Sequence, residues 1–223
     1  MQTEIKAVSA ELTENETINI GILLFNEVEV LDFCGPFEVL SLASSLMVDF
    51  KKRAEPPFAV FTVAERPGII RARGNLLVQP HFTIDDHPPI DLLIVPGGMG
   101  TRREVNNSDL IDWLFNVTQQ ARLNASVCTG SFLLGKVGLL EGRKVTTHWA
   151  SLERMAKDFP KVEVQTGVRW VDQGDIVTSA GISAGLDMSL HLVERFLGRE
   201  MAEATAKQME YSWDEGQNAE AEN

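Results

Sequence analysis

The chain has 223 residues, which is enough for one domain with a well-buried core and short for two. With 44% apolar and 23% charged residues, its composition is that of an ordinary globular protein. A formal net charge of −12 repels phosphate backbones, so we expect no nucleic-acid partner.

The two ends of the chain differ in composition from the middle. Residues 1–17 alternate charged and small residues and lack the apolar core of a signal peptide, so we predict a flexible N-terminal arm there. We expect the folded domain at residues 18–211 and a flexible acidic tail at residues 212–223. No uninterrupted apolar run reaches the roughly 20 residues that cross a bilayer. We therefore expect a cytoplasmic protein without a membrane partner.

The cysteine and histidine counts bound the redox state and the metal chemistry. Two cysteines, Cys34 and Cys128, are too few for a disulfide scaffold. We expect two reduced thiols, although counting alone leaves a pairing open. The four histidines are scattered and form no H-x-x-x-H pair, so the sequence indicates no metal site.

Strand and helix patterns alternate along the chain. Residues 18–25 form a nearly continuous apolar run, as in strands buried on both faces of a parallel sheet, and further strands are expected at 58–63, 76–78, 91–95 and 125–127. Helical spacing follows near 37–46, after an N-cap at Ser108, and at 131–138, 149–159 and 186–197, with a short helix after Arg199. Residues 168–171 and 176–178 predict a hairpin. This order predicts an α/β fold, flavodoxin-like and doubly wound, with a mostly parallel sheet and helices on both faces.

Functional groups in such sheets gather where the strands end at their carboxyl side. One such place is Cys128, at a sharp strand-to-helix junction that would expose a nucleophile. We expect the positive end of the following helix to lower the thiol pKa, because the thiolate is the attacking species. The alternative is a buried structural cysteine.

Two further strand ends carry candidate residues. The amides of Gly97 and Gly98, with the amide after Cys128, could hold an anionic intermediate, or they could form a plain turn. Asp32 lies among apolar residues after the first strand, where a carboxyl with a raised pKa could shuttle a proton, or where it could cap a helix.

Supporting roles are open for two more side chains. His148 follows the nucleophile by twenty residues and could activate it as a Cys–His pair, or could cap a helix without a catalytic contact. Asp187, on the last long helix, could likewise support catalysis or have no catalytic contact.

Together these segments resemble the ThiJ/PfpI superfamily of class-I glutamine-amidotransferase-like proteins, and most of all its isonitrile hydratase group. The resemblance covers residues 19–211. The matching segments are Leu31-Asp32 with Gly35-Pro36, Val95-Pro96-Gly97-Gly98, Ser126-Val127-Cys128-Thr129-Gly130-Ser131, Gly138-Leu139-Leu140 with Gly142-Arg143, Thr146-Thr147-His148-Trp149, and Gly181-Ile182-Ser183-Ala184-Gly185-Leu186-Asp187.

The resemblance implies a function that sequence patterns alone do not give. It places the nucleophile on Cys128, its acidic partner on Asp32 and a neighbouring hydroxyl on Thr129. The implied reaction is hydration of an isonitrile to an N-substituted formamide by a homodimer, with water as cosubstrate and no metal or organic cofactor. Other amidase, deglycase or hydrolase activities, or a cysteine-based redox sensor without turnover, remain as alternatives.

Overall fold

The computed structural model describes residues 16–50 and 52–214 and is built on one central sheet of seven strands. The strands lie in the order β10-β11-β7-β6-β1-β2-β5, and every neighbouring pair is parallel except β10 with β11. Their bounds are β1 Ile18–Leu24, β2 Phe58–Ala64, β5 Phe82–Thr83, β6 Leu92–Val95, β7 Leu123–Val127, β10 Trp170–Asp172 and β11 Ile176–Ser179. The predicted fold class and the hairpin are therefore confirmed.

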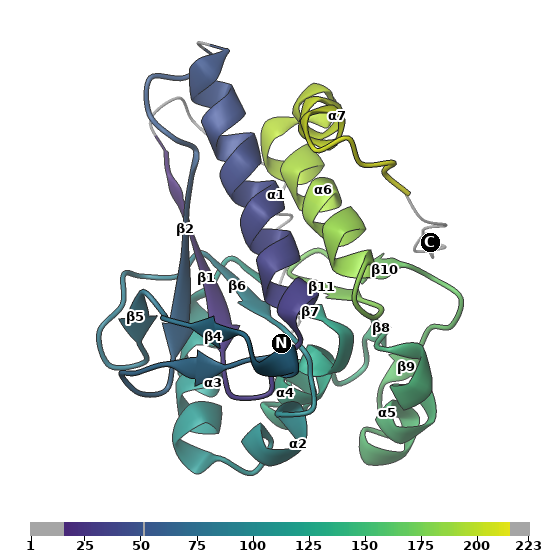
Figure 1. The fold of residues 1–223 in the computed structure, drawn as a ribbon. Helices are drawn as coiled ribbons and strands as arrows, with labels where there is room; N and C mark the ends of the chain where they lie inside the picture. The colour runs from purple at the N-terminus through teal and green to yellow at the C-terminus, as the bar shows by residue number, and fades with distance from the viewer. Residues whose placement is uncertain (1–15, 51, 215–223) are drawn as a thin grey trace.

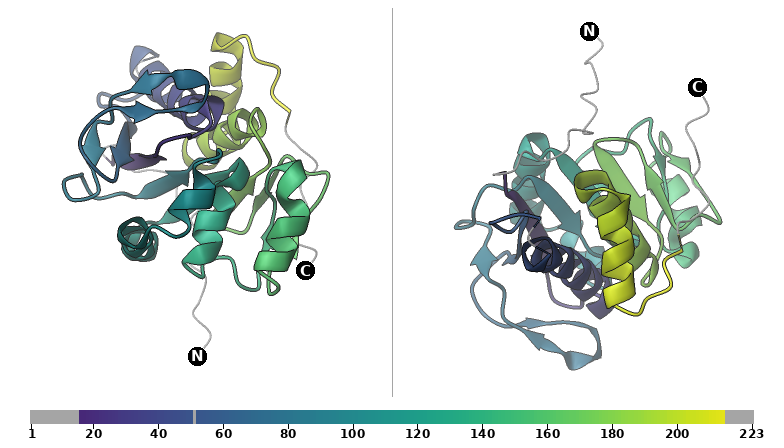
Figure 2. Two further views of the ribbon diagram at one scale, coloured as in Figure 1. Left: turned by 60° about the horizontal axis from the view of Figure 1, so that its bottom comes forward. Right: turned by 90° about the horizontal axis from the view of Figure 1, so that it is seen from above.

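Helices cover both faces of this sheet (Figure 1). One face carries α1 (Val30–Asp49), α6 (Ala184–Leu197) and α7 (Arg199–Gln208), which also contact one another. The other face carries α2 (Thr101–Glu104), α3 (Ser108–Gln120) and α4 (Ser131–Lys136), while α5 (Leu152–Asp158) lies beside the sheet with the short strands β8 and β9 (Figures 1 and 2).

Several elements are short and peripheral. Two-stranded sheets pair β3 (Ile70–Arg71) with β4 (Leu77–Val78), and β8 (Lys144–Val145) with β9 (Glu163–Val164). Single 3₁₀ turns occupy Arg73–Asn75, Cys128–Gly130 and Trp149–Ser151. The N-cap of α3 is Asn107, whose side chain accepts from the Leu110 amide, and the predicted cap at Ser108 is therefore wrong by one residue.

The core of the sheet consists of β1, β6 and β7, which are adjacent and almost wholly buried. Burial on both faces explains the unbroken apolar runs in the sequence. Because the three strands are parallel, their carboxyl ends meet at one edge. The chain leaves that edge toward Asp32, Gly97 and Cys128, respectively.

The first helix, α1, is longer than its apolar spacing predicts. It begins before Pro36, and a proline at this position cannot donate to the carbonyl of Asp32 one turn earlier. By length and composition α1 is the one described helix that could also cross a membrane. The sequence prediction, which considered uninterrupted apolar runs alone, did not identify it. Half of that window is buried, and the helix packs against β1, β2, α6 and α7, as a core helix does.

Both ends of the described chain are held to the domain. The Thr17 hydroxyl donates to the Pro56 carbonyl, and the Asp214 amide donates to Asp187. Residues 1–15 and 215–223, which include most of the predicted arm and tail, lie outside the described residues.

Candidate active site

Cys128 occupies a sharp turn between β7 and α4. Its φ of 57° lies in the left-handed region that non-glycine residues seldom adopt. Three hydrogen bonds hold this backbone: the Cys128 amide donates to the Ala180 carbonyl at 3.2 Å, and the Cys128 carbonyl accepts from the Thr147 hydroxyl at 2.8 Å and the Ser131 hydroxyl at 3.2 Å. The predicted strand-to-helix elbow is confirmed.

Two glycines allow the three strand ends to come together. A Cβ on Gly130 would lie 1.9 Å from the Val95 carbonyl oxygen, so only glycine permits the elbow to pass this close to β6. A Cβ on Gly97 would lie 2.6 Å from the Thr129 amide nitrogen and 2.9 Å from Asp32 Oδ2. Both positions therefore define how closely the acid, the nucleophile and the glycine turn approach one another.

Asp32 is a fully buried carboxyl in the first turn of α1. Its Oδ2 accepts from the Gly97 amide at 3.1 Å. Its Oδ1 is buried and has no hydrogen-bond partner among the described residues. Burial raises the pKa of Asp32 to about 7, with a further rise from Glu29, while the Gly97 amide, the Cys128 thiol and the Ile182 amide act in the opposite direction. The raised pKa agrees with the prediction, while the proton-carrying role stays a prediction; the helix-cap alternative is wrong because Glu29 is the N-cap.

The Cys128 sulfur is in a different electrostatic state from the one that the sequence predicts. Burial, followed by the charge of Asp32, raises the pKa of Cys128 to about 12, and this outweighs the opposing Thr129 amide and hydroxyl. The expected lowering of the thiol pKa is therefore wrong. The α4 helix has only six residues and is separated from the sulfur by a 3₁₀ turn, so its dipole does not overcome desolvation. Burial thus favours the protonated sulfur over the thiolate.

The amides of Gly97 and Gly98 are already engaged. Gly97 donates to Asp32, and Gly98 donates to Thr129 Oγ1 at 3.1 Å. Thr129 Oγ1 also accepts from the buried Thr101 hydroxyl at 3.2 Å. These amides thus orient the two candidate side chains, and their role as anion donors stays a prediction.

Thr101 and Ile182 are contributors that the sequence reasoning missed. Thr101 bonds both the Gly98 carbonyl and Thr129, while Ile182, with a φ of 52°, directs its amide toward Asp32. Ile182 lies in one of the segments that carry the family resemblance, but no residue pattern indicates that its backbone would turn this way.

His148 is a capping residue in this structure. Its Nδ1 accepts from the Ala150 amide at 3.3 Å at the start of the 3₁₀ turn, and its ring packs so closely on Gly181 that a Cβ there would lie 2.2 Å from Cδ2. Among the described residues it makes no hydrogen bond to Cys128, so a Cys–His pair is not formed.

Asp187 belongs to a separate buried ion pair. Its Oδ2 accepts from Arg169, with 2.8 Å to Nε, and its Oδ1 accepts from the Tyr211 hydroxyl and the Asp214 amide, each at 3.0 Å. Both oxygens are therefore used to attach the C-terminal segment to α6. This arrangement is structural.

The second cysteine takes no part in the site. Cys34 is partly buried on α1, both thiols are free, and burial raises the pKa of Cys34 as well. Within residues 16–50 and 52–214, no group of three or more His, Cys, Asp or Glu side chains is arranged to hold a metal ion.

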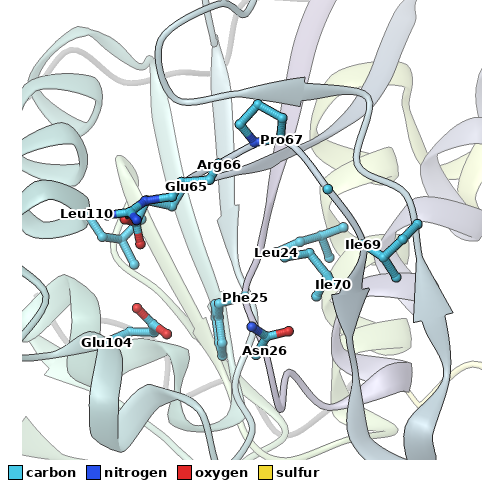
Figure 3. A pocket seen from close by; sticks show the side chains of 11 residues that line it. Leu24, Phe25, Asn26, Glu65, Arg66, Pro67, Ile69, Ile70, Glu104 and Leu110 are labelled. Atoms are coloured by element: carbon cyan, nitrogen blue, oxygen red, sulfur yellow. The ribbon is translucent and has the colours of Figure 1, made fainter.

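A pocket of about 190 Å³ lies apart from the nucleophile (Figure 3). Its apolar lining includes Phe25 and Ile70, and its polar lining includes Asn26 and Glu104. The Glu104 carboxylate is already bonded to Arg103 and Asn107. The pocket does not include Cys128, Asp32 or Thr129, so the candidate chemistry is not located there.

Comparison with known proteins agrees with this geometry. Residues 19–195 match the DJ-1/PfpI family. The chain belongs to this family. It is 33% identical to isonitrile hydratase of Pseudomonas putida over 195 residues, which are 87% of this chain and 79% of that protein. It is also 31% identical to the HTH-type transcriptional regulator GbdR of Pseudomonas aeruginosa over 86% of this chain, but it spans only 50% of that regulator.

Solved structures support the same fold for this DJ-1/PfpI protein. A ThiJ/PfpI family protein from Pseudomonas syringae superposes with a TM-score of 0.79 at 24% identity, covering 96% of this chain and 83% of the other. DJ-1beta of Drosophila melanogaster gives 0.72 at 19% identity, covering 88% of this chain and all of the other. The resemblance inferred from the sequence is confirmed.

Proposed function

We propose that this protein hydrates an isonitrile to an N-substituted formamide, with Cys128 as nucleophile and Asp32 as proton carrier. The observation that carries the proposal is the buried Cys128–Asp32 pair, in which the carboxyl has a pKa of about 7. The similarity to isonitrile hydratase supports the choice of substrate class.

In the first step the two residues act together. Ionised Asp32 takes the thiol proton as the sulfur forms a bond to the terminal carbon of R–N≡C. Asp32 then delivers this proton to the same carbon, which gives a thioimidate, R–N=CH–S–Cys128. General acid–base catalysis is most effective when the pKa of the catalytic group lies near the working pH, and a pKa of about 7 meets that condition.

In the second step Asp32 activates water. The carboxylate takes one proton from water as the oxygen bonds to the thioimidate carbon, and passes it to the nitrogen, which gives R–NH–CH(OH)–S–Cys128. The remaining hydroxyl proton is the one that Asp32 transfers to the sulfur in the last stage. The C–S bond then breaks, R–NH–CHO leaves, and the sulfur regains its proton. Thr129, held by Gly98 and Thr101, would position the adduct or the water. The net reaction consumes one water and requires no metal or organic cofactor.

The alternatives differ in what they demand of the sulfur. A redox sensor needs a standing thiolate. A sensor does not need a matched proton carrier, so the buried Asp32 carboxyl beside Cys128 supports the enzyme. A related amidase, deglycase or hydrolase would use the same pair on another small molecule, and only a substrate panel separates these activities from hydration.

The cellular setting follows from composition and from the family. We infer a cytoplasmic homodimer that acts on a small molecule without nucleic acid. The net charge of −12 supports the last point, although the family includes transcriptional regulators.

The test is turnover of cyclohexyl isocyanide, with the formamide product measured by mass spectrometry. We expect product from the wild type and from Cys34→Ala, a matched control on the same helix as Asp32, and none above background from Cys128→Ala or Asp32→Asn. Wild-type rates in Cys128→Ala would refute the nucleophile. Absence of turnover in the wild type, together with ready sulfinate formation at Cys128, would favour the sensor. Turnover of small amides or dicarbonyls alone would favour the related hydrolases.

A further inference from the structure

A second hollow, of about 390 Å³, lies between α2, α4 and α5, outside the Cys128–Asp32 pair. These helices lie together at the bottom of Figure 1. Three cations from three elements line the hollow: Arg102, Lys136 and Arg154. Asp158 is the one carboxylate in the same lining. This local excess of positive charge contrasts with the net charge of −12 for the whole chain.

None of the three cations forms a salt bridge, whereas most of the arginines in the described part of the chain do. Arg195, for example, contacts Asp172 at 2.9 Å. Within the described part of the chain, no carboxylate lies within 4.0 Å of Arg102, Lys136 or Arg154. Their charge is therefore available to a bound group.

Arg154 is held in a defined position. Its guanidinium carbon lies 3.8 Å from the centroid of the Phe132 ring. Its Nε is buried and has no hydrogen-bond partner among residues 16–50 and 52–214. Burial and the neighbouring Arg102 lower the pKa of Arg154, and the charge of Asp158 opposes them only in part. A buried donor without an acceptor, next to a second cation, is unfavourable until an acceptor with negative charge is supplied.

The floor of the hollow is aromatic and rigid. The rings of Phe132 and Phe159 meet at 5.9 Å with an interplanar angle of 60°. Gly135 permits this packing, because a Cβ there would lie 2.8 Å from the Phe159 ring. Phe132 is almost wholly buried beneath Arg154, so the partly exposed Phe159 offers the surface on which a flat apolar group could pack beside the cations.

We propose that this hollow is a binding site for a small organic anion, a phosphate or carboxylate joined to a planar apolar group. A guanidinium stacked on an aromatic ring keeps its edge N–H groups free, and these match the paired oxygens of phosphate or carboxylate. The volume falls within the range of about 300–1,000 Å³ typical of small-molecule sites. The apolar floor distinguishes this ligand class from a simple inorganic anion.

The test is calorimetric titration of the full chain with phenyl phosphate at low ionic strength. Inorganic phosphate and benzylamine serve as comparison probes. The variants are Arg154→Gln and Lys136→Gln, the second at an exposed position where folding is not at risk. Arg66→Gln is the matched control, because it removes the same charge from an exposed arginine outside this hollow.

We expect phenyl phosphate to bind the wild type and Arg66→Gln equally, and each of the other variants about tenfold more weakly. Binding should be weaker for inorganic phosphate and absent for benzylamine. Cys128→Ala should bind like the wild type, so this result does not depend on the proposed enzyme activity. Equal binding by Lys136→Gln and wild type, equal binding of benzylamine, or no binding of phenyl phosphate at millimolar concentration would overturn the proposal.

Discussion

Replacement of Asp32 by asparagine should stabilise the protein in a pH-dependent way while abolishing catalysis. The folded state raises the pKa of Asp32 from 3.8 to about 7, so between these values the folded protein binds more protons than the unfolded chain. Stability then falls as the pH rises through this window. The favourable contribution of the protonated carboxyl is fully present below about pH 4 and is lost above about pH 7.

The magnitude follows from the two pKa values. At about 1.4 kcal/mol per pH unit, the full cost of ionising the buried carboxyl is roughly 4 kcal/mol above pH 7. Roughly 2 kcal/mol of this cost is already present at pH 5. The stabilising effect of Asp32→Asn should therefore be larger at pH 8 than at pH 5 by roughly 2–3 kcal/mol. Any pH-independent effect of the asparagine side chain on the free energy of unfolding is the same at both pH values, so it drops out of this difference.

The assay is urea unfolding of wild type and variant at pH 5 and pH 8. Asp49→Asn, at the exposed C-terminal end of the same helix, is the control and should differ from wild type by less than about 0.5 kcal/mol at both pH values. If Asp32→Asn shifts the free energy of unfolding equally at pH 5 and pH 8, the carboxyl is not held in its protonated form, and the proton-carrier argument fails with it.

Other substitutions test the remaining parts of the site. Thr129→Val removes the hydroxyl that accepts from the Gly98 amide, so kcat/KM for cyclohexyl isocyanide should fall about 10- to 100-fold. The circular dichroism spectrum should not change, and an unchanged kcat/KM would exclude a role for the hydroxyl. Gly97→Ala forces a methyl group against the site and should cost about 1–3 kcal/mol and most of the activity. Gly138→Ala has open space but a φ of 80°, so it should cost about 1 kcal/mol through backbone strain and still keep kcat/KM. Asp187→Asn breaks a buried ion pair and should lower the free energy of unfolding by about 2–3 kcal/mol, a value reduced because its partner Arg169 is partly exposed. We expect kcat to be retained, and a matching loss of kcat would place Asp187 in the catalytic machinery.

The sequence predicts the central elements well because their physical signal is strong. Strands β1 and β6 are buried on both faces and β2 over its second half, so each is an apolar run close to the expected length. The short elements α2, β5, β8 and β9 escape prediction because two to four residues do not contain a full period of any pattern.

The site is predicted less completely than the fold. Strand ends and the family resemblance place Cys128, Asp32 and Thr129, and the parallel order of the central strands brings them together. The charge state of the sulfur could not be predicted, because desolvation depends on how side chains from distant segments close over it. The same is true of Thr101, whose hydroxyl reaches Thr129 only in the folded chain.

Burial of both members of the pair explains how a protonated thiol can serve a nucleophilic mechanism. If the sulfur were ionised at rest, oxidants would compete with the substrate for it. Here burial disfavours the charge on both the thiol and the carboxyl. In the proposed mechanism the thiolate would form only as a substrate carbon arrives and Asp32 takes the proton. The folded state carries an ionisable group in an unfavourable environment for this purpose, which is a cost in stability that catalysis at this pair requires.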